Sequence, residues 1–210
     1  MRTFVYIDGF NLYYGAVKDT PYKWLDLKAL FKRILKPYND ILAIKYYTAR
    51  VTARPGDPDA PTRQNVFINA IQAHIPELEI TYGHFLQNNV RMPLTHPKPW
   101  QKTVEVVKTE EKGSDVNLAV HVLNDAWQNQ YDCAVICSND SDLSESLKLV
   151  RKQHKKRIVL VVPGYPSVRT PAIQLKRFAN AVVQITEDDL KASQLPNPIP
   201  GTTIKKPATW

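Results

Sequence analysis

Cys133-Ala-Val-Ile-Cys-Ser-Asn-Asp-Ser-Asp142 is an uninterrupted apolar run that stops at a small polar turn with two carboxylates. Apolar residues then recur at roughly helical spacing, at positions 143, 147, 149 and 150. In an open α/β sheet, chemistry is presented where a strand ends and a helix begins. The stretch therefore predicts a buried strand whose carboxyl end carries Asp140 and Asp142.

Strand-like and helix-like segments alternate along the rest of the chain. Short β-prone runs occur at residues 3–7, 41–50, 78–86, 103–108, 158–162 and 181–185. Helical patterns occupy 27–35 after the cap Asp26, 62–75, 114–127 with Ser114 as N-cap, 172–178 and 187–194. Residues 87–100 hold three prolines and are interpreted as a loop or lid.

This alternation predicts an α/β fold, specifically a three-layer α/β/α sandwich with a mostly parallel central sheet and Rossmann-like topology. One domain is expected over residues 1–190. Residues 191–210 contain four prolines and no apolar run, so they are interpreted as a Pro-rich tail. Ile204 and Trp210 give that tail a means of docking.

Charge and cysteine content indicate which class of partner and which cellular compartment to expect. The 210 residues include 28 Lys and Arg against 20 Asp and Glu, which gives a net charge of +8. This charge favours a polyanionic partner, but a basic surface that serves only solubility explains the charge equally well. Cys133 and Cys137 are separated by ~13 Å of predicted strand, beyond disulfide reach, and are read as buried thiols of a reducing compartment. Neither a signal peptide nor a membrane-length apolar run is visible, so a cytoplasmic location without a membrane partner is expected.

Four aspartates stand at the ends of predicted elements. Asp8 follows the first strand, Asp115 opens a helix, and Asp140 and Asp142 follow the strand at 133–137. Parallel strands bring such turns to one edge of a sheet, where the carboxylates repel one another unless a cation lies among them. Oxygen ligands without a His or Cys cluster favour Mg²⁺ or Mn²⁺ over zinc. Taken singly, each aspartate is as well explained as a turn residue or helix cap.

Three motifs in this order resemble the NYN family of PIN-like nucleases, in its LabA-like bacterial branch. The motifs are Tyr6-Ile-Asp-Gly-Phe-Asn-Leu12, Glu111-Lys-Gly-Ser-Asp-Val-Asn-Leu118 and Ser138-Asn-Asp-Ser-Asp-Leu143. The match extends over roughly residues 3–190. Asn139 stands where many relatives have Gly, and Leu143 where an aromatic residue is common, but neither departure removes an acid.

The resemblance implies a PIN-like sandwich and a Mg²⁺- or Mn²⁺-dependent endoribonuclease. It carries over Asp8, Asp115 and Asp140 as metal-binding and catalytic acids, with Asp142 beside them. Asn11 would orient Asp8 or contact substrate.

Single-stranded RNA is the substrate expected from basic and aromatic residues in the predicted loops. The residues expected to bind it are Asn11, Arg50, Trp100, Lys112, Ser138 and Asn139. Further basic residues there are Arg54, Arg63, Lys98, Lys102, Lys108, Arg169 and Lys176. Further aromatic residues are Tyr13, Tyr14, Tyr47, Tyr82 and Phe85, most of which are equally well explained as packing residues.

Two other functions fit the same fold. One is a non-catalytic RNA-binding or scaffolding module, and the other is a small-molecule metal hydrolase. Some relatives are named as pyridine-ring hydroxylases, but the sequence has no Gly-x-Gly-x-x-Gly fingerprint for a flavin or nicotinamide. The sequence is compatible with a homodimer and with an antitoxin or regulatory protein as partner.

Overall fold

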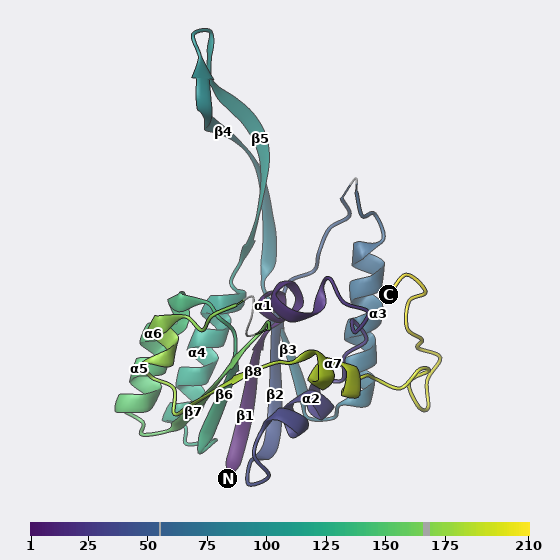
Figure 1. Cartoon of the computed structure of the whole chain (residues 1–210), viewed down its shortest axis with the longest axis vertical. Coiled ribbons are helices and arrows are strands. Elements are labelled where there is room, and N and C mark those ends of the chain that lie inside the picture. The colour runs from purple at the N-terminus through teal and green to yellow at the C-terminus, as the bar shows by residue number, and fades with distance from the viewer. Residues whose placement is uncertain (55, 166–168) are drawn as a thin grey trace.

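The computed structural model describes residues 1–54, 56–165 and 169–210. A six-stranded sheet in the order β3-β2-β1-β6-β7-β8 forms its centre, and every strand pair in it is parallel (Figure 1). Its strands are β1 (Arg2–Asp8), β2 (Asp40–Thr48), β3 (Leu78–Tyr82), β6 (Cys133–Cys137), β7 (Arg157–Val162) and β8 (Ala181–Gln184). The predicted strand at 133–137 is confirmed.

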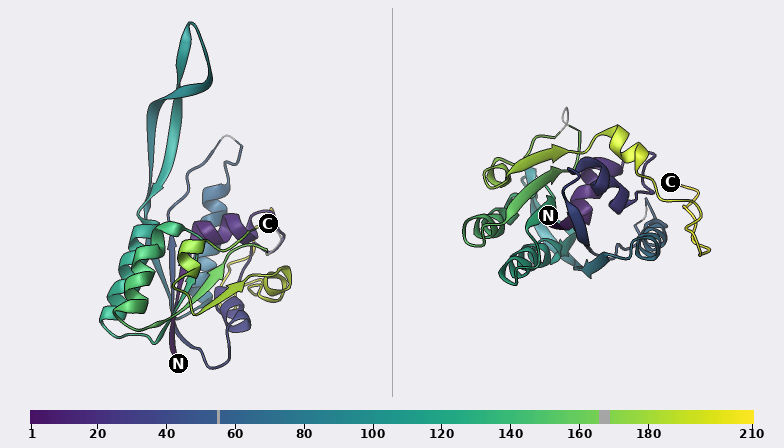
Figure 2. Two further views of the ribbon diagram at one scale, coloured as in Figure 1. Left: turned by 60° about the vertical axis from the view of Figure 1, so that its left-hand side comes forward. Right: turned by 90° about the horizontal axis from the view of Figure 1, so that it is seen from below.

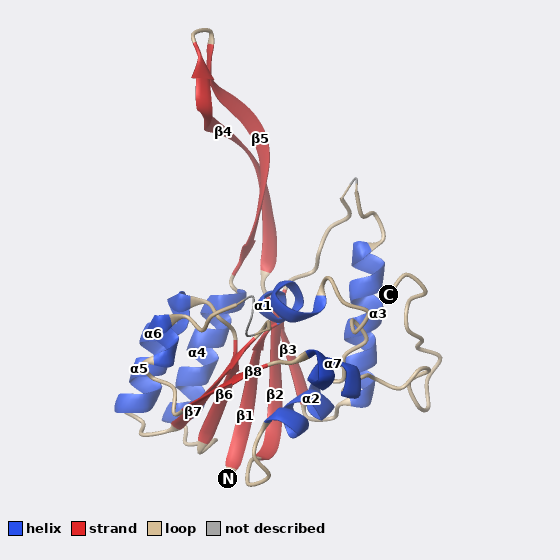
Figure 3. Ribbon diagram, in the orientation of Figure 1, coloured by secondary structure: helices blue, strands red, loops and turns tan. Residues whose placement is uncertain are grey.

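Helices lie on both faces of this sheet (Figure 3). They are α1 (Gly9–Leu12), α2 (Leu27–Ile34), α3 (Ala60–His74), α4 (Ser114–Trp127), α5 (Ser144–Lys152), α6 (Ile173–Lys176) and α7 (Glu187–Ala192). A π-helical turn, Tyr13–Val17, continues α1, and a 3₁₀ turn, Ser141–Leu143, precedes α5. The predicted cap of α2 is confirmed, since the carboxylate of Asp26 accepts the Ala29 N–H at 3.0 Å.

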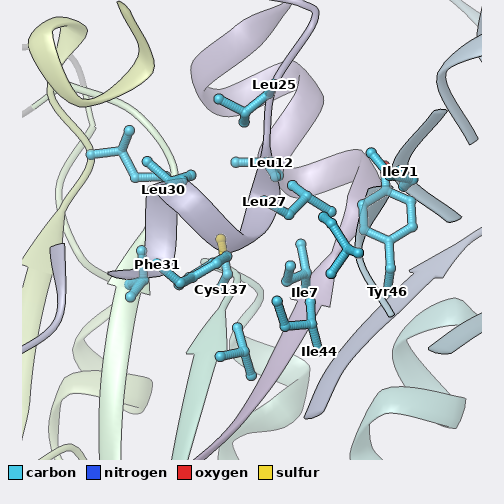
Figure 4. Close-up of a cluster of buried hydrophobic side chains, with 14 of the residues drawn as sticks. Ile7, Leu12, Leu25, Leu27, Leu30, Phe31, Ile44, Tyr46, Ile71 and Cys137 are labelled. Carbon is cyan, nitrogen blue, oxygen red and sulfur yellow. The ribbon is translucent and has the colours of Figure 1, made fainter. Parts of the chain in front are cut away.

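The central strands divide the interior into two hydrophobic cores. Val5 and Ile7 of β1 belong to one core. Figure 4 shows Ile7 there, together with residues of α2 and α3. Phe4 and Tyr6, which alternate with them, point into the other core beneath α4 and α5. Burial on both faces explains why the strand at 133–137 is apolar at every position. The predicted three-layer α/β/α fold is confirmed.

The interpretation of residues 87–100 as a loop or lid is wrong. Residues 87–98 belong to β4 (His84–Lys98), and residues 99–100 form the turn to β5 (Gln101–Lys112). The two strands pair in a long antiparallel hairpin that projects from the body (Figures 1 and 2). Proline is tolerated because both strands of a two-stranded ribbon are edge strands. The register is broken only between Pro93 and Lys98. The single strand predicted at 78–86 is therefore two strands, divided at Gly83.

Residues after α7 pack against the body of the protein. The Trp24 indole Nε1 donates to the Pro196 carbonyl at 3.1 Å, and Leu195 and Ile199 are buried. The Trp210 ring contacts those of Trp24 and Phe67, with centroids 6.5 and 5.9 Å away. The Pro-rich segment thus contributes apolar side chains to the first core.

Both cysteines are free and buried. Burial raises the pKa of the Cys133 thiol to about 11 and raises that of Cys137 further, so neither is a reactive thiolate at neutral pH. In the described ranges, no helix combines the length and apolar character that a membrane crossing requires.

Candidate metal centre

The strand order reverses between β1 and β6, which is where open α/β sheets form their binding crevice. Ile7 faces Cys137 in the parallel register, so the next residues, Asp8 and Ser138, leave the sheet side by side. The Ser138 hydroxyl donates to Asp8 Oδ2 at 3.2 Å. Two predicted motifs, 130 positions apart in the chain, are thereby joined.

Asp8 is held rigidly at the end of β1. Its Oδ1 accepts the Asn11 backbone N–H at 2.9 Å, which caps α1, and its Oδ2 accepts the Asn11 side-chain amide at 2.8 Å. Only 7% of Asp8 is exposed, and this burial raises the pKa of its carboxyl above the ordinary value. The charge of Asp140 raises that pKa too, whereas the bonds from Asn11 and Ser138 lower it.

Asp140 stands at the end of β6 and caps the 3₁₀ turn. Its Oδ1 accepts the Asp142 N–H at 3.0 Å. Its own backbone N–H donates to Ser138 Oγ at 3.1 Å. Ser138 therefore links the carboxylate of Asp8 to the backbone of Asp140, which fixes the spacing of the two acids.

Asp115 enters the site from the first turn of α4, at the base of the hairpin. The predicted N-cap Ser114 is wrong: the cap is Gly113, with φ of 96°, and Ser114 is the first helical residue. Instead, Glu111 Oε1 accepts both the backbone N–H and the hydroxyl of Ser114, at 3.2 and 2.7 Å. A Cβ on Gly83 would lie 2.4 Å from the Lys112 carbonyl, so glycine is what lets the hairpin close on the helix start.

Three carboxylates come together at this edge of the sheet. One oxygen each from Asp115, Asp140 and Asp142 lies within 4.8 Å of the others. Asp8 lies outside this trio but lines the same cavity of about 330 Å³ as Asp115 and Asp140. Such like charges are costly at this spacing unless a cation neutralises them, and an all-oxygen donor set suits Mg²⁺ or Mn²⁺. The residues present therefore fit the predicted ion. The predicted metal ligands are Asp8, Asp115 and Asp140, whereas the trio within 4.8 Å contains Asp142 in place of Asp8.

Asn11 serves several contacts besides Asp8. Its Oδ1 accepts from Arg169 Nη2 at 2.9 Å and from the Asn139 backbone N–H at 3.3 Å. The Asn139 amide in turn accepts the Ala172 N–H at 2.7 Å and donates to Thr170 at 3.0 Å. Asn11 thus lines the carboxylate cavity. Ser138 is fully buried behind Asp8 and does not line it, and the side chain of Asn139 holds the segment that precedes α6.

The other predicted substrate contacts are not brought to the cavity. Arg50 lies over the Tyr82 ring, 4.6 Å from its centroid, and donates to its hydroxyl at 3.0 Å. The Lys112 ammonium pairs with Glu110 at 3.1 Å. Trp100 lies at the turn of the hairpin and is 80% exposed.

Three aromatic side chains that were not among the predicted substrate contacts line the carboxylate cavity: Phe10, Tyr14 and Phe85. The rings of Phe10 and Tyr14 are stacked with centroids 6.4 Å apart, and Phe85 meets Phe10 edge-on at 5.7 Å. The sequence predicts no role for Phe10 or Glu111, which also line this cavity. Both lie within the motifs, two positions after Asp8 and four positions before Asp115, and that proximity is the signal the sequence offers.

The chain matches known proteins over most of its length. The NYN domain model matches residues 2–185. Over 238 aligned positions that span the whole chain and 75% of the relative, it is 35% identical to 6-hydroxy-3-succinoylpyridine 3-monooxygenase HspA of Pseudomonas putida (strain DSM 28022 / S16).

A solved structure has the same fold. VPA0982, a protein of unknown function from Vibrio parahaemolyticus RIMD 2210633, aligns with a TM-score of 0.56 at 16% identity, covering 89% of this chain and 94% of that one. The family match extends over all three motifs that carried the resemblance. The chain belongs to the NYN domain family.

Proposed function

We propose that this protein is a Mg²⁺- or Mn²⁺-dependent endoribonuclease of the LabA-like, PIN-like branch. The observation that carries the proposal is the trio Asp115, Asp140 and Asp142, within 4.8 Å of one another where β1 and β6 end. These three residues would hold the ion, and Asp8 would complete the cavity. When bound, such an ion polarises a phosphate oxygen and lowers the pKa of a bound water.

The chain's own residues position the substrate. Arg54 lines the cavity and offers a guanidinium to a phosphate. The rings of Phe10, Tyr14 and Phe85 suit the unstacked bases of a single strand. The net charge of +8 favours association with a polyanion.

RNA cleavage by purified protein tests the proposal. Mg²⁺ or Mn²⁺ is expected to support cleavage of single-stranded RNA, EDTA to stop it, and Asp140→Asn to abolish it in a folded protein. Asp188→Asn is the matched control, because Asp188 is an exposed aspartate of α7. Salt-sensitive RNA binding with no cleavage under either metal, unchanged in Asp140→Asn, would instead favour the non-catalytic binding module.

A second candidate function rests on the identity of 35% to a protein named as a monooxygenase, across the whole chain. In this second proposal, the chain hydroxylates a small hydroxylated pyridine. Consumption of O₂ and of such a pyridine, with a reduced nicotinamide as electron donor, would support it. The absence of a Gly-x-Gly-x-x-Gly motif leaves the protein without the usual dinucleotide fingerprint, so the nuclease is the first proposal.

A further inference from the structure

A second cavity, of about 280 Å³, adjoins the carboxylate cavity. The two share Phe10, Tyr14 and Arg54 as lining residues. The second cavity lies between the turn that follows α1, the end of β2 and the face of α3. It contains none of the four aspartates, so the proposed metal chemistry does not account for it.

The walls of this cavity are flat and aromatic. Tyr13 and Tyr14 meet edge-on with centroids 5.2 Å apart, and Phe67 and Trp210 lie 5.9 Å apart. Rigid rings offer a large apolar surface at a small loss of conformational entropy. The volume is just below the roughly 300–1,000 Å³ of drug-sized pockets, which suits one planar ring with a substituent.

The lining carries an excess of positive charge. Four basic residues line it against one acid, Asp57, which is neutralised at 2.6 Å by one of them, Arg63. The basic residues are Lys18, Lys23, Arg54 and Arg63. Among the described residues, the guanidinium of Arg54 makes no hydrogen bond or ion pair, and it stands where the two cavities meet. An anionic ligand is therefore favoured.

Tyr46 is a largely buried residue that lines this cavity, and its hydroxyl has no hydrogen-bond partner in the described residues. Only 8% of this side chain is exposed, yet the hydroxyls of the other buried tyrosines, Tyr6, Tyr47 and Tyr131, all have hydrogen-bond partners. Burial raises the pKa of the Tyr46 phenol, so it remains a donor at neutral pH. A Cβ on Gly9 would lie 2.7 Å from this oxygen, so glycine at that position leaves it room.

We propose that this cavity binds the ring of an anionic heteroaromatic ligand. The Tyr46 hydroxyl donates to a ring nitrogen or exocyclic oxygen, and Arg54 meets the anionic group at the boundary with the carboxylate cavity. Two sources share this chemistry, the base of a nucleotide and a free single-ring heteroaromatic acid. The nucleotide source rests on the proposed nuclease function, whereas ring binding itself does not.

Calorimetric titration of the full chain in EDTA tests ring binding without metal or turnover. The probes are AMP, UMP, nicotinate and inorganic phosphate. At least one ring-bearing anion is expected to bind more tightly than phosphate. Tyr46→Phe should weaken that binding by about 3- to 10-fold, because only a hydroxyl is removed. Tyr38→Phe, at an exposed tyrosine, should leave it unchanged.

The preferred probe identifies the source. Tighter binding of AMP or UMP supports a nucleotide base, and tighter binding of nicotinate supports a free acid. The proposal is overturned if no ring-bearing anion binds more tightly than phosphate. It is equally overturned if a Tyr46→Phe protein with wild-type melting behaviour binds the preferred probe as well as wild type.

Failure of this proposal is distinguishable from failure of the nuclease. A protein that binds rings but cleaves no RNA refutes the nuclease alone. A protein that cleaves RNA but binds no ring-bearing anion refutes the ring site alone.

Discussion

Ser138 Oγ lies 3.2 Å from Asp8 Oδ2, and this single hydroxyl joins the carboxyl ends of β1 and β6. The same oxygen accepts the backbone N–H of Asp140 at 3.1 Å. Ser138 is fully buried, so its geometry is set by the sheet rather than by solvent. A small residue that touches no metal therefore positions two of the acids that we propose as the metal centre.

Ser138→Ala should weaken Mn²⁺ binding. Residues that orient metal ligands typically contribute about 10- to 100-fold in affinity, and this substitution removes a donor from Asp8 and an acceptor from Asp140. Calorimetric titration with Mn²⁺ measures the loss. Ser146→Ala is the control, because the Ser146 hydroxyl bonds to the Leu143 carbonyl at 2.8 Å within the α5 region. Equal Mn²⁺ affinity in Ser138→Ala and wild type would contradict the positioning role.

The pH dependence of stability should show the buried carboxylate of Asp8. Its pKa in the folded protein is raised above 3.8, first by burial, so the folded state binds more protons than the unfolded chain just above that pH. The free energy of unfolding in EDTA, taken as wild type minus Asp8→Asn, is therefore expected to fall as pH rises from 3.8 to the raised pKa. Above the raised pKa it should be level.

Urea unfolding of both proteins at a series of pH values measures this difference. The subtraction removes the titrations that the two proteins share. A difference that rises with pH would mean that the pKa of Asp8 is lowered by its three hydrogen-bond donors instead.

Asp125→Ala should destabilise the protein strongly. The Asp125 carboxylate is 4% exposed and accepts from the Tyr6 hydroxyl and the Lys45 ammonium, both at 2.7 Å. Removing it leaves a largely buried cation and a phenol without their main partner, at a cost of roughly 3–5 kcal/mol. Chemical denaturation measures the change.

Asp132→Ala is the matched contrast, because Asp132 also pairs with a basic residue, Arg2, at 2.7 Å but at the surface. Exposed pairs of this kind are worth about 1 kcal/mol or less. If the two variants lost similar amounts of unfolding free energy, burial of the Asp125 pair would not determine how much that pair contributes to stability.

Truncating the hairpin should leave the body folded. Replacing residues 86–110 by Asn-Gly keeps the Phe85–Glu111 pair and a two-residue turn. The free energy of unfolding is expected to change by less than about 1 kcal/mol, because the removed residues belong to neither core. Thermal and urea unfolding measure it, and the RNA affinity of the truncated protein then tests the predicted contribution of Trp100.

Gly83→Ala, at the base of the same hairpin, is the contrast. Its Cβ would meet the Lys112 carbonyl at 2.4 Å, so this one methyl group should destabilise the protein more than the loss of the whole ribbon. The opposite order would mean that the projecting hairpin, rather than its base, supports the start of α4.

Local patterns were sufficient for most of the layered fold. The apolar run at 133–137 predicted a buried strand, and the Asp26 cap predicted the start of α2, because both depend on neighbouring residues alone. The hairpin escaped this reasoning. Its prolines indicate a loop when read locally, and only pairing with residues 101–112 makes a ribbon of them.

The sequence by itself determined which acids stand at element ends, since strand exits and helix starts have local signatures. Only the tertiary structure decided how these acids group. The register of β1 against β6 brings Asp8 to Ser138, and the hairpin base places Asp115 beside Asp140 and Asp142. The partnerless hydroxyl of Tyr46 likewise has no sequence signature, because solvation and pairing depend on residues distant in the chain.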